Sequence, residues 1–103
     1  MSEIEYLVRV ILSKGYCIKT KNSPTTRNLN DVMKIAVSAG SESWWLAITD
    51  SESSKNVLGV FYIDNDLNGW GRIDWDESKI ISLHDLMIEA ANLEASESEA
   101  SVV

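Results

Sequence analysis

The first pattern along the chain is a stripe of apolar residues with helical spacing. Its members recur at i, i+3, i+4, i+7 and i+8 and are Ile4, Leu7, Val8, Ile11 and Leu12. Ser2 precedes Glu5 by the spacing of a capping box, and Gly15 stands where a glycine commonly ends a helix. The pattern therefore predicts an N-terminal helix with one apolar face.

A second helical stripe lies near the C-terminus. Its apolar positions are Leu83, Leu86, Met87, Ala90 and Ala91. Ser82 is a candidate cap, with Asp85 three residues later. After Glu94 the residues are small or acidic and have little apolar surface to bury. We predict a C-terminal helix that ends near residue 94, followed by a flexible acidic tail over residues 95–103.

Four segments between these helices have the composition of strands. Each is rich in β-branched or aromatic residues and is bounded by turn-forming residues; they are residues 16–20, 43–49, 57–63 and 70–75. Residues 21–28 contain Asn, Ser and the single Pro, so they are predicted to form a loop.

Residues 29–40 fit either a helix or a strand. Leu29, Val32 and Met33 have helical spacing, with Asn28 as a cap and Gly40 as a stop. The alternation of apolar residues over 33–37 instead fits a strand. The cap and stop signals favour the helix, and the strand stays open as the alternative.

Together these elements predict a small α+β fold in a single domain over residues 1–94. A three- to four-stranded antiparallel sheet, arranged as a meander, would be packed on one face by the N-terminal and C-terminal helices. The fold gains a third short helix at 29–38 if that segment is a helix rather than a strand. The length of 103 residues and the hydrophobic content of 45% suit one such core.

The composition also indicates the cellular compartment in which the chain is expected to act. The longest apolar run, Trp44 to Ile48, is far shorter than the roughly 20 residues of a membrane span. The N-terminus lacks the basic start of a signal peptide. Cys17 is the single cysteine, which excludes an internal disulfide and a paired-cysteine metal site. We therefore expect a cytoplasmic protein without a membrane partner.

Charge is distributed unevenly along the chain. The net charge is −7, but residues 1–38 carry +3 and residues 39–103 carry −10. An acidic surface repels phosphate backbones and attracts basic surfaces. We therefore expect no direct binding to nucleic acid and a basic protein as partner.

Candidate catalytic groups are few. His84 is the single histidine, and no motif assembles a nucleophile, a base and an orienting group around it or around Cys17. Asp74, Asp76 and Glu77 could supply paired carboxylates, yet acids near a strand end are usually solvated. We expect no enzymatic activity, and therefore no cofactor.

One short motif resembles a metal site. The sequence Asp64-x-Asp66-x-Asn68-Gly69 resembles the opening of an EF-hand calcium loop. Trp75 stands where that family has its bidentate glutamate, and the flanks are predicted strands rather than helices. The resemblance implies at most a weak calcium site, and an ordinary turn explains the same residues.

Four tryptophans lie between residues 44 and 75. Trp44 and Trp45 are adjacent and should point to opposite faces of a strand. Alternation along the last strand places Trp70 with Asp74 and places Trp75 with Ile73 on the other face. An exposed tryptophan among acids is typical of a binding hot spot. The predicted partner-binding residues are Trp44, Asp64, Asp66, Trp70, Asp74, Asp76 and Glu77.

In size, acidity and lack of a catalytic set, the chain resembles phage anti-defence proteins, such as anti-CRISPR or anti-restriction inhibitors, and the immunity proteins that neutralise nuclease toxins. The implied function is a stoichiometric inhibitor that covers a basic, nucleic-acid-binding protein. The alternatives are an adaptor or oligomer subunit, including a homodimer, that docks through apolar surface, a weak calcium-binding module, or a small enzyme.

Overall fold

The computed structural model describes residues 3–21, 23–39, 42–53, 56–65, 71–78 and 82–102, with side chains omitted at 3, 65, 71–78 and 98–102. In chain order the elements of the described part are α1 (Glu3–Ser13), β1 (Cys17–Thr20), β2 (Ser23–Thr26), α2 (Leu29–Ala39), β3 (Trp44–Thr49), β4 (Val57–Asn65), β5 (Gly71–Ser78) and α3 (Leu83–Val102).

The strands form one antiparallel sheet in the order β2-β1-β3-β4-β5. β3, β4 and β5 follow one another as a meander, and α2 carries the chain from the edge strand β2 back to β3. This arrangement confirms the predicted α+β class, with an antiparallel sheet and helices at both ends of the chain.

The prediction of a loop over residues 21–28 was wrong in part, and the described sheet has five strands rather than three or four. Ser23–Thr26 pairs with β1 as the edge strand β2. Pro24 is exposed on this edge, where a missing N–H removes no hydrogen bond from the sheet. Thr25 and Thr26 suit an extended backbone, a preference that the Pro and Ser signals concealed.

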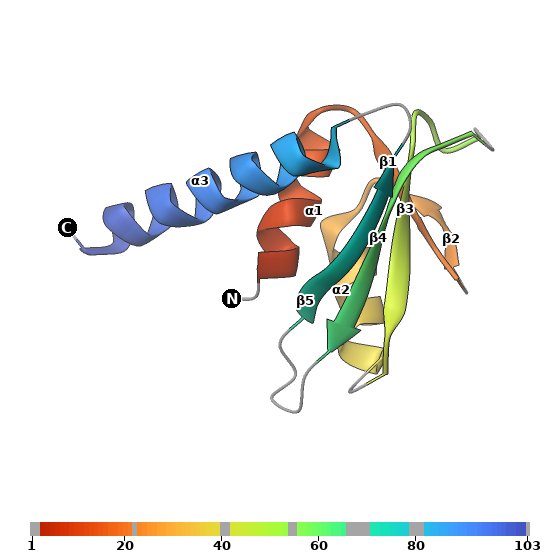
Figure 1. Cartoon of the computed structure of the whole chain (residues 1–103), viewed down its shortest axis with the longest axis horizontal. Helices are drawn as coiled ribbons and strands as arrows, with labels where there is room; N and C mark the ends of the chain where they lie inside the picture. Colours follow the sequence, from red (N-terminus) through yellow and green to blue (C-terminus); the bar gives the residue numbers. More distant parts are fainter. Residues whose placement is uncertain are drawn as a thin grey trace.

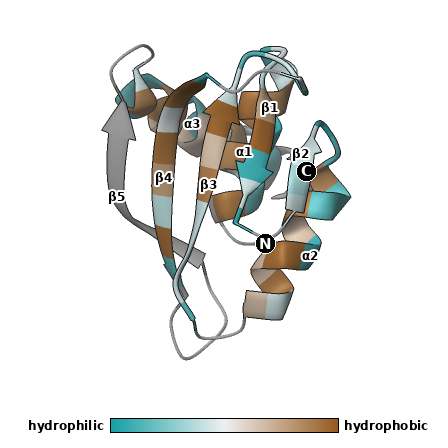
Figure 2. Ribbon diagram, turned by 90° about the vertical axis from the view of Figure 1, so that its right-hand side faces the viewer, coloured by the Kyte–Doolittle hydropathy of each residue, from teal (hydrophilic) through white to brown (hydrophobic). Residues whose placement is uncertain are grey.

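One face of the sheet holds the core. The fully buried residues of this face are Ile18, Leu46, Ile48, Phe61 and Ile63. The three helices lie on the same side of the sheet as these residues, as the nearly edge-on view of Figure 1 shows. In Figure 2 the sheet stands in front, with α1 and α3 behind it.

α1 is the central element of the helical layer. It packs against α2, α3, β1 and β5, and its apolar stripe is buried as the sequence predicts. The helix ends before Gly15, which has a φ of +87°. A side chain would strain the backbone there, so glycine suits the transition from α1 to β1.

Residues 29–39 are helical, which settles the alternative left open by the sequence. The Asn28 side-chain oxygen accepts a hydrogen bond from the Asn30 backbone N–H at 2.8 Å, so Asn28 caps α2 as predicted. Val32 is fully buried in the common core, whereas Val37 on the outer side of the helix is 79% exposed.

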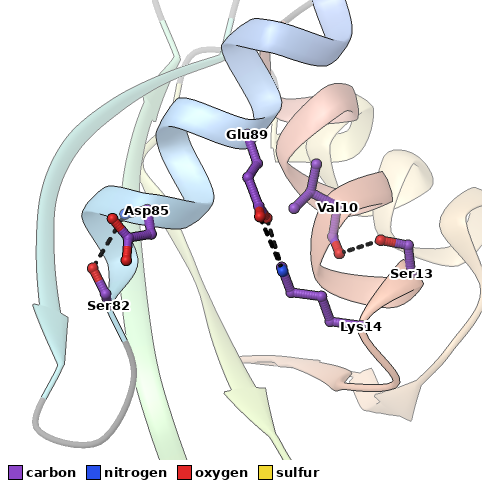
Figure 3. Close-up of polar contacts among 6 residues, drawn as sticks. All are labelled: Val10, Ser13, Lys14, Ser82, Asp85 and Glu89. Atoms are coloured by element: carbon purple, nitrogen blue, oxygen red, sulfur yellow. Dashed lines mark hydrogen bonds and ion pairs between the residues drawn. The ribbon is translucent and has the colours of Figure 1, made fainter.

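α3 begins where the sequence predicts, because the Ser82 hydroxyl accepts a hydrogen bond from the Asp85 N–H at 3.2 Å. Ion pairs join it to α1 and to the turn that follows α1: Arg9 of α1 pairs with Glu97 at 2.7 Å, and Lys14 of the turn pairs with Glu89 at 2.9 Å, as drawn in Figure 3. The hydrogen bond from Arg9 lowers the pKa of Glu97.

The expected helix end near residue 94 was wrong, because α3 continues to Val102. Small and acidic residues such as those after Glu94 bury little, yet alanine and glutamate favour helix, and contact between Glu97 and Arg9 extends the packed part of α3. The flexibility of residues 95–103 stays a prediction. No helix in the described part is long and apolar enough to cross a membrane.

Two valines on α2 provide a matched test of this packing. Val32→Ala should lower the free energy of unfolding by about 2 kcal/mol, because methyl groups lose burial and leave a cavity. Val37→Ala should change it by less than about 0.5 kcal/mol. Urea unfolding followed by circular dichroism measures both. Equal effects would contradict the observed orientation of α2.

Candidate protein-binding surface

The face of the sheet opposite the helices is formed by Lys19, Trp45, Ala47, Val60 and Tyr62, and we call it the open face. Ala47 lies between Lys19 of β1 and Val60 of β4 in the strand register, and Trp45 lies directly opposite Tyr62. Paired residues of neighbouring strands share a face, so these five residues form a continuous surface. Figure 2 shows this side of the sheet with no helix in front of it.

Trp45 and Tyr62 form an aromatic pair toward one end of the open face. The Tyr62 residue is 37% exposed, and Trp45 is partly exposed. Cross-strand aromatic pairs stabilise a sheet and at the same time present a large, stiff contact area. The neighbouring Ala47 is small and buried, which leaves the two rings as the main contact groups.

The two ends of the open face differ in charge. At the Trp45 end, the Asp64 carboxylate accepts a hydrogen bond from the Ser43 hydroxyl at 3.1 Å. At the opposite end, Arg27 donates to the sulfur of the buried Cys17 at 3.2 Å. This hydrogen bond raises the pKa of the Arg27 guanidinium, which stays charged. The Asp64 end therefore carries a negative charge and the Arg27 end a positive one.

A pocket of about 440 Å³ adjoins the Trp45 end of the open face. Its walls come from the end of β1, the start of β2, the last turn of α2 and the start of β3. The lining residues are Thr20, Lys21, Ser23, Ile35, Ser38, Ala39, Glu42, Ser43, Trp44 and Trp45. Trp45 belongs to both the pocket and the open face, so one partner could cover both.

The predicted partner-binding residues fall in different parts of the structure. Trp44 lies on the core side of β3, opposite Ile63, and is only 9% exposed. Its access to a ligand is therefore through the pocket rather than across an exposed face. Asp64 is partly exposed at the end of β4. Asp66 and Trp70 lie outside the described residues.

The acidic residues Asp74, Asp76 and Glu77 belong to β5, whose backbone alone is described. Ile63 pairs with Ile73 while the adjacent Tyr62 pairs with Trp75, so Asp74 is an extra residue in a bulge. The simple alternation predicted for this strand was therefore wrong. Ile73 and Trp75 do not occupy equivalent positions, because their partners Ile63 and Tyr62 lie on opposite faces of the sheet.

The described residues bring no metal-binding set together. No group of three potential metal ligands occurs among them. Asp64 contacts Ser43, and Asn68 of the calcium-like motif lies outside the described part. Cys17 is fully buried beneath Arg27, while His84 is exposed in the first turn of α3.

Sequence reasoning missed the contributions of Tyr62 and Glu42. The alternation of Val60 and Tyr62 with the buried Phe61 did contain a signal for Tyr62, because alternate residues of a strand face opposite sides. No local pattern marks Glu42, since its place in the pocket wall depends on α2 and β1. Comparisons with models of known protein families, with curated proteins and with solved structures find no match to this chain.

Adjacent aromatics on β4 test the assignment of the two faces. Phe61→Ala should lower the free energy of unfolding by about 3–5 kcal/mol, because Phe61 is fully buried. Tyr62→Ala should cost about 1 kcal/mol or less, the range of one cross-strand pair. Urea unfolding of both variants measures the difference. A loss at Tyr62 as large as that at Phe61 would contradict an open face.

Proposed function

We propose that this chain is a non-catalytic inhibitor that binds a basic, nucleic-acid-binding or nuclease protein through the open face of its sheet. The observation that carries the proposal is the partly exposed Trp45–Tyr62 pair, which lies beside Asp64 on a sheet face that no described helix covers. Aromatic residues at the centre of a surface, bordered by polar groups, are typical of binding hot spots.

The negative charge of the chain favours binding to a basic partner. The net charge is −7, with −10 in residues 39–103, which include β3 and β4. An arginine of the partner could stack on Trp45 or Tyr62 and reach the carboxylate of Asp64. The predicted contacts Asp66, Trp70, Asp74, Asp76 and Glu77 remain part of the proposal. Of these, Glu77 pairs with Val60 of the open face, whereas Asp76 pairs with Phe61, which faces the core.

Inhibition by coverage requires only a complementary surface, so it needs no catalytic group. The proposal therefore assigns no catalytic role to His84 or Cys17. A nuclease or nucleic-acid-binding protein has a basic site for phosphates, and an acidic protein can compete for that site. The proposed action is therefore stoichiometric, and the partner would be inactive while the complex lasts.

Capture from a lysate of the source organism tests this function. Tagged wild-type protein, Tyr62→Ala and Asp64→Asn are compared, with Val37→Ala as the control for an exposed apolar residue distant from the open face. We expect the wild type and the control to retain the same basic protein at low salt. Retention should fall about tenfold with Tyr62→Ala, as for a hot-spot aromatic, and should weaken at high salt.

The retained protein must then lose its nucleic-acid binding or cleavage when one equivalent of the purified chain is added. A neutral or acidic partner that is held at every salt concentration would contradict the proposal. Loss of retention in Val37→Ala alone would also contradict it and would favour apolar docking through α2.

A further inference from the structure

The pocket beside the open face has the size of a ligand site rather than of a packing defect. Its volume of about 440 Å³ lies within the range of about 300–1,000 Å³ that is usual for ligand pockets. Ile35 and Ala39 of α2 supply apolar wall, and Trp44 and Trp45 of β3 supply indole groups. A side chain with an apolar stem and a polar head matches this mixture.

Several groups in the wall favour a positively charged head. Glu42 lines the pocket, and the last turn of α2 ends there. A helix C-terminus carries partial negative charge, and α2 has no Lys or Arg in its last turn to offset it. Indole rings also attract cations.

Thr20 provides an independent indication of a missing partner. The residue is 3% exposed, lines the pocket, and its hydroxyl oxygen has no hydrogen-bond partner among the described residues. Buried polar groups are usually hydrogen-bonded, so an orphan hydroxyl at a pocket wall indicates that a ligand or water completes its bonding. The hydroxyl can accept a hydrogen bond from an N–H donor.

Lys21 is the one positive charge in the described lining. It is exposed on the turn between β1 and β2, and it forms no ion pair of 4.0 Å or less with Glu42. Lys21 would oppose a cationic ligand and favour an anionic one, so its effect on binding reveals the sign of the ligand's charge.

We infer that this pocket receives an arginine side chain of the partner, with the guanidinium group held by Glu42 and the indole groups of Trp44 and Trp45. The guanidinium group is planar, always charged and rich in N–H donors, which suits indole walls and scattered oxygen acceptors better than the compact ammonium of lysine. The inference rests on the proposed function, because a basic partner on the open face would supply this arginine next to Trp45.

A small probe tests the pocket without the partner. N-acetyl-arginine amide is titrated into the ¹⁵N-labelled protein, and N-acetyl-citrulline amide, its neutral analogue of similar shape, is the control. We expect the arginine probe to shift the Trp45 indole signal and the backbone signals of Thr20 and Glu42. The citrulline probe should leave these signals in place, because it lacks the charge that the pocket selects.

Three variants then establish the sign of the charge. Glu42→Gln should weaken probe binding by about threefold, and Lys21→Gln should strengthen it by about twofold, as expected for partly exposed charge pairs. Asp50→Asn removes an equal charge at the opposite end of β3 and should have no effect. Equal binding of both probes, reversed effects of Glu42→Gln and Lys21→Gln, or no shift at the pocket would overturn the inference.

The inhibitor function and the arginine pocket can each be contradicted without the other. Capture of a basic protein without probe binding would remove the arginine pocket and leave the inhibitor function. Probe binding without such capture would leave a pocket selective for guanidinium groups and remove the inhibitor function.

Discussion

The burial of α1 against one side of the sheet is the interaction on which the rest of the structure depends. Leu7, Val8 and Ile11 are fully buried, and α1 also contacts the other two helices. Each such side chain contributes about 1.5–3 kcal/mol when it leaves water. Because α1 shares its core with α2 and α3, the described helices all gather on one side of the sheet.

Because the described helices pack on one side of the sheet, the open face has no helix over it. The described helices cover one side of the five-stranded sheet, and the other side carries the Trp45–Tyr62 pair toward one end. Asp64 and Glu42 lie toward the same end, where the pocket opens beside Trp45. The aromatic pair, the pocket and the two acidic residues therefore lie toward the same end of the open face, although they come from different strands and loops.

Local signals in the sequence were sufficient to predict where α2 and α3 begin. Asn28 and Ser82 cap α2 and α3 as predicted, because a cap depends on residues within one helical turn. β2 was missed because Pro24 is a turn signal in most settings, and its tolerance at an edge depends on the strand beside it. The end of α3 was missed because Glu97 contacts Arg9, which is 88 residues away in sequence.

The candidate site was less predictable than the fold. Trp44 and Trp45 were expected on opposite faces, which the structure confirms, but the sequence did not say which of them faces the core. The bulge at Asp74 depends on pairing between β4 and β5, and no local pattern announces it. The pocket combines α2, β1 and β3, so only the assembled fold places Glu42 near Thr20.

Photo-crosslinking tests most directly whether the open face is the binding surface. The photoreactive residue p-benzoylphenylalanine is placed at Tyr62 on the open face, or at Ile88 on α3, which has a similar exposure of 46%. After irradiation in the lysate, we expect a crosslinked basic protein from position 62 and none from position 88. The same product from position 88, with none from position 62, would contradict binding through the open face.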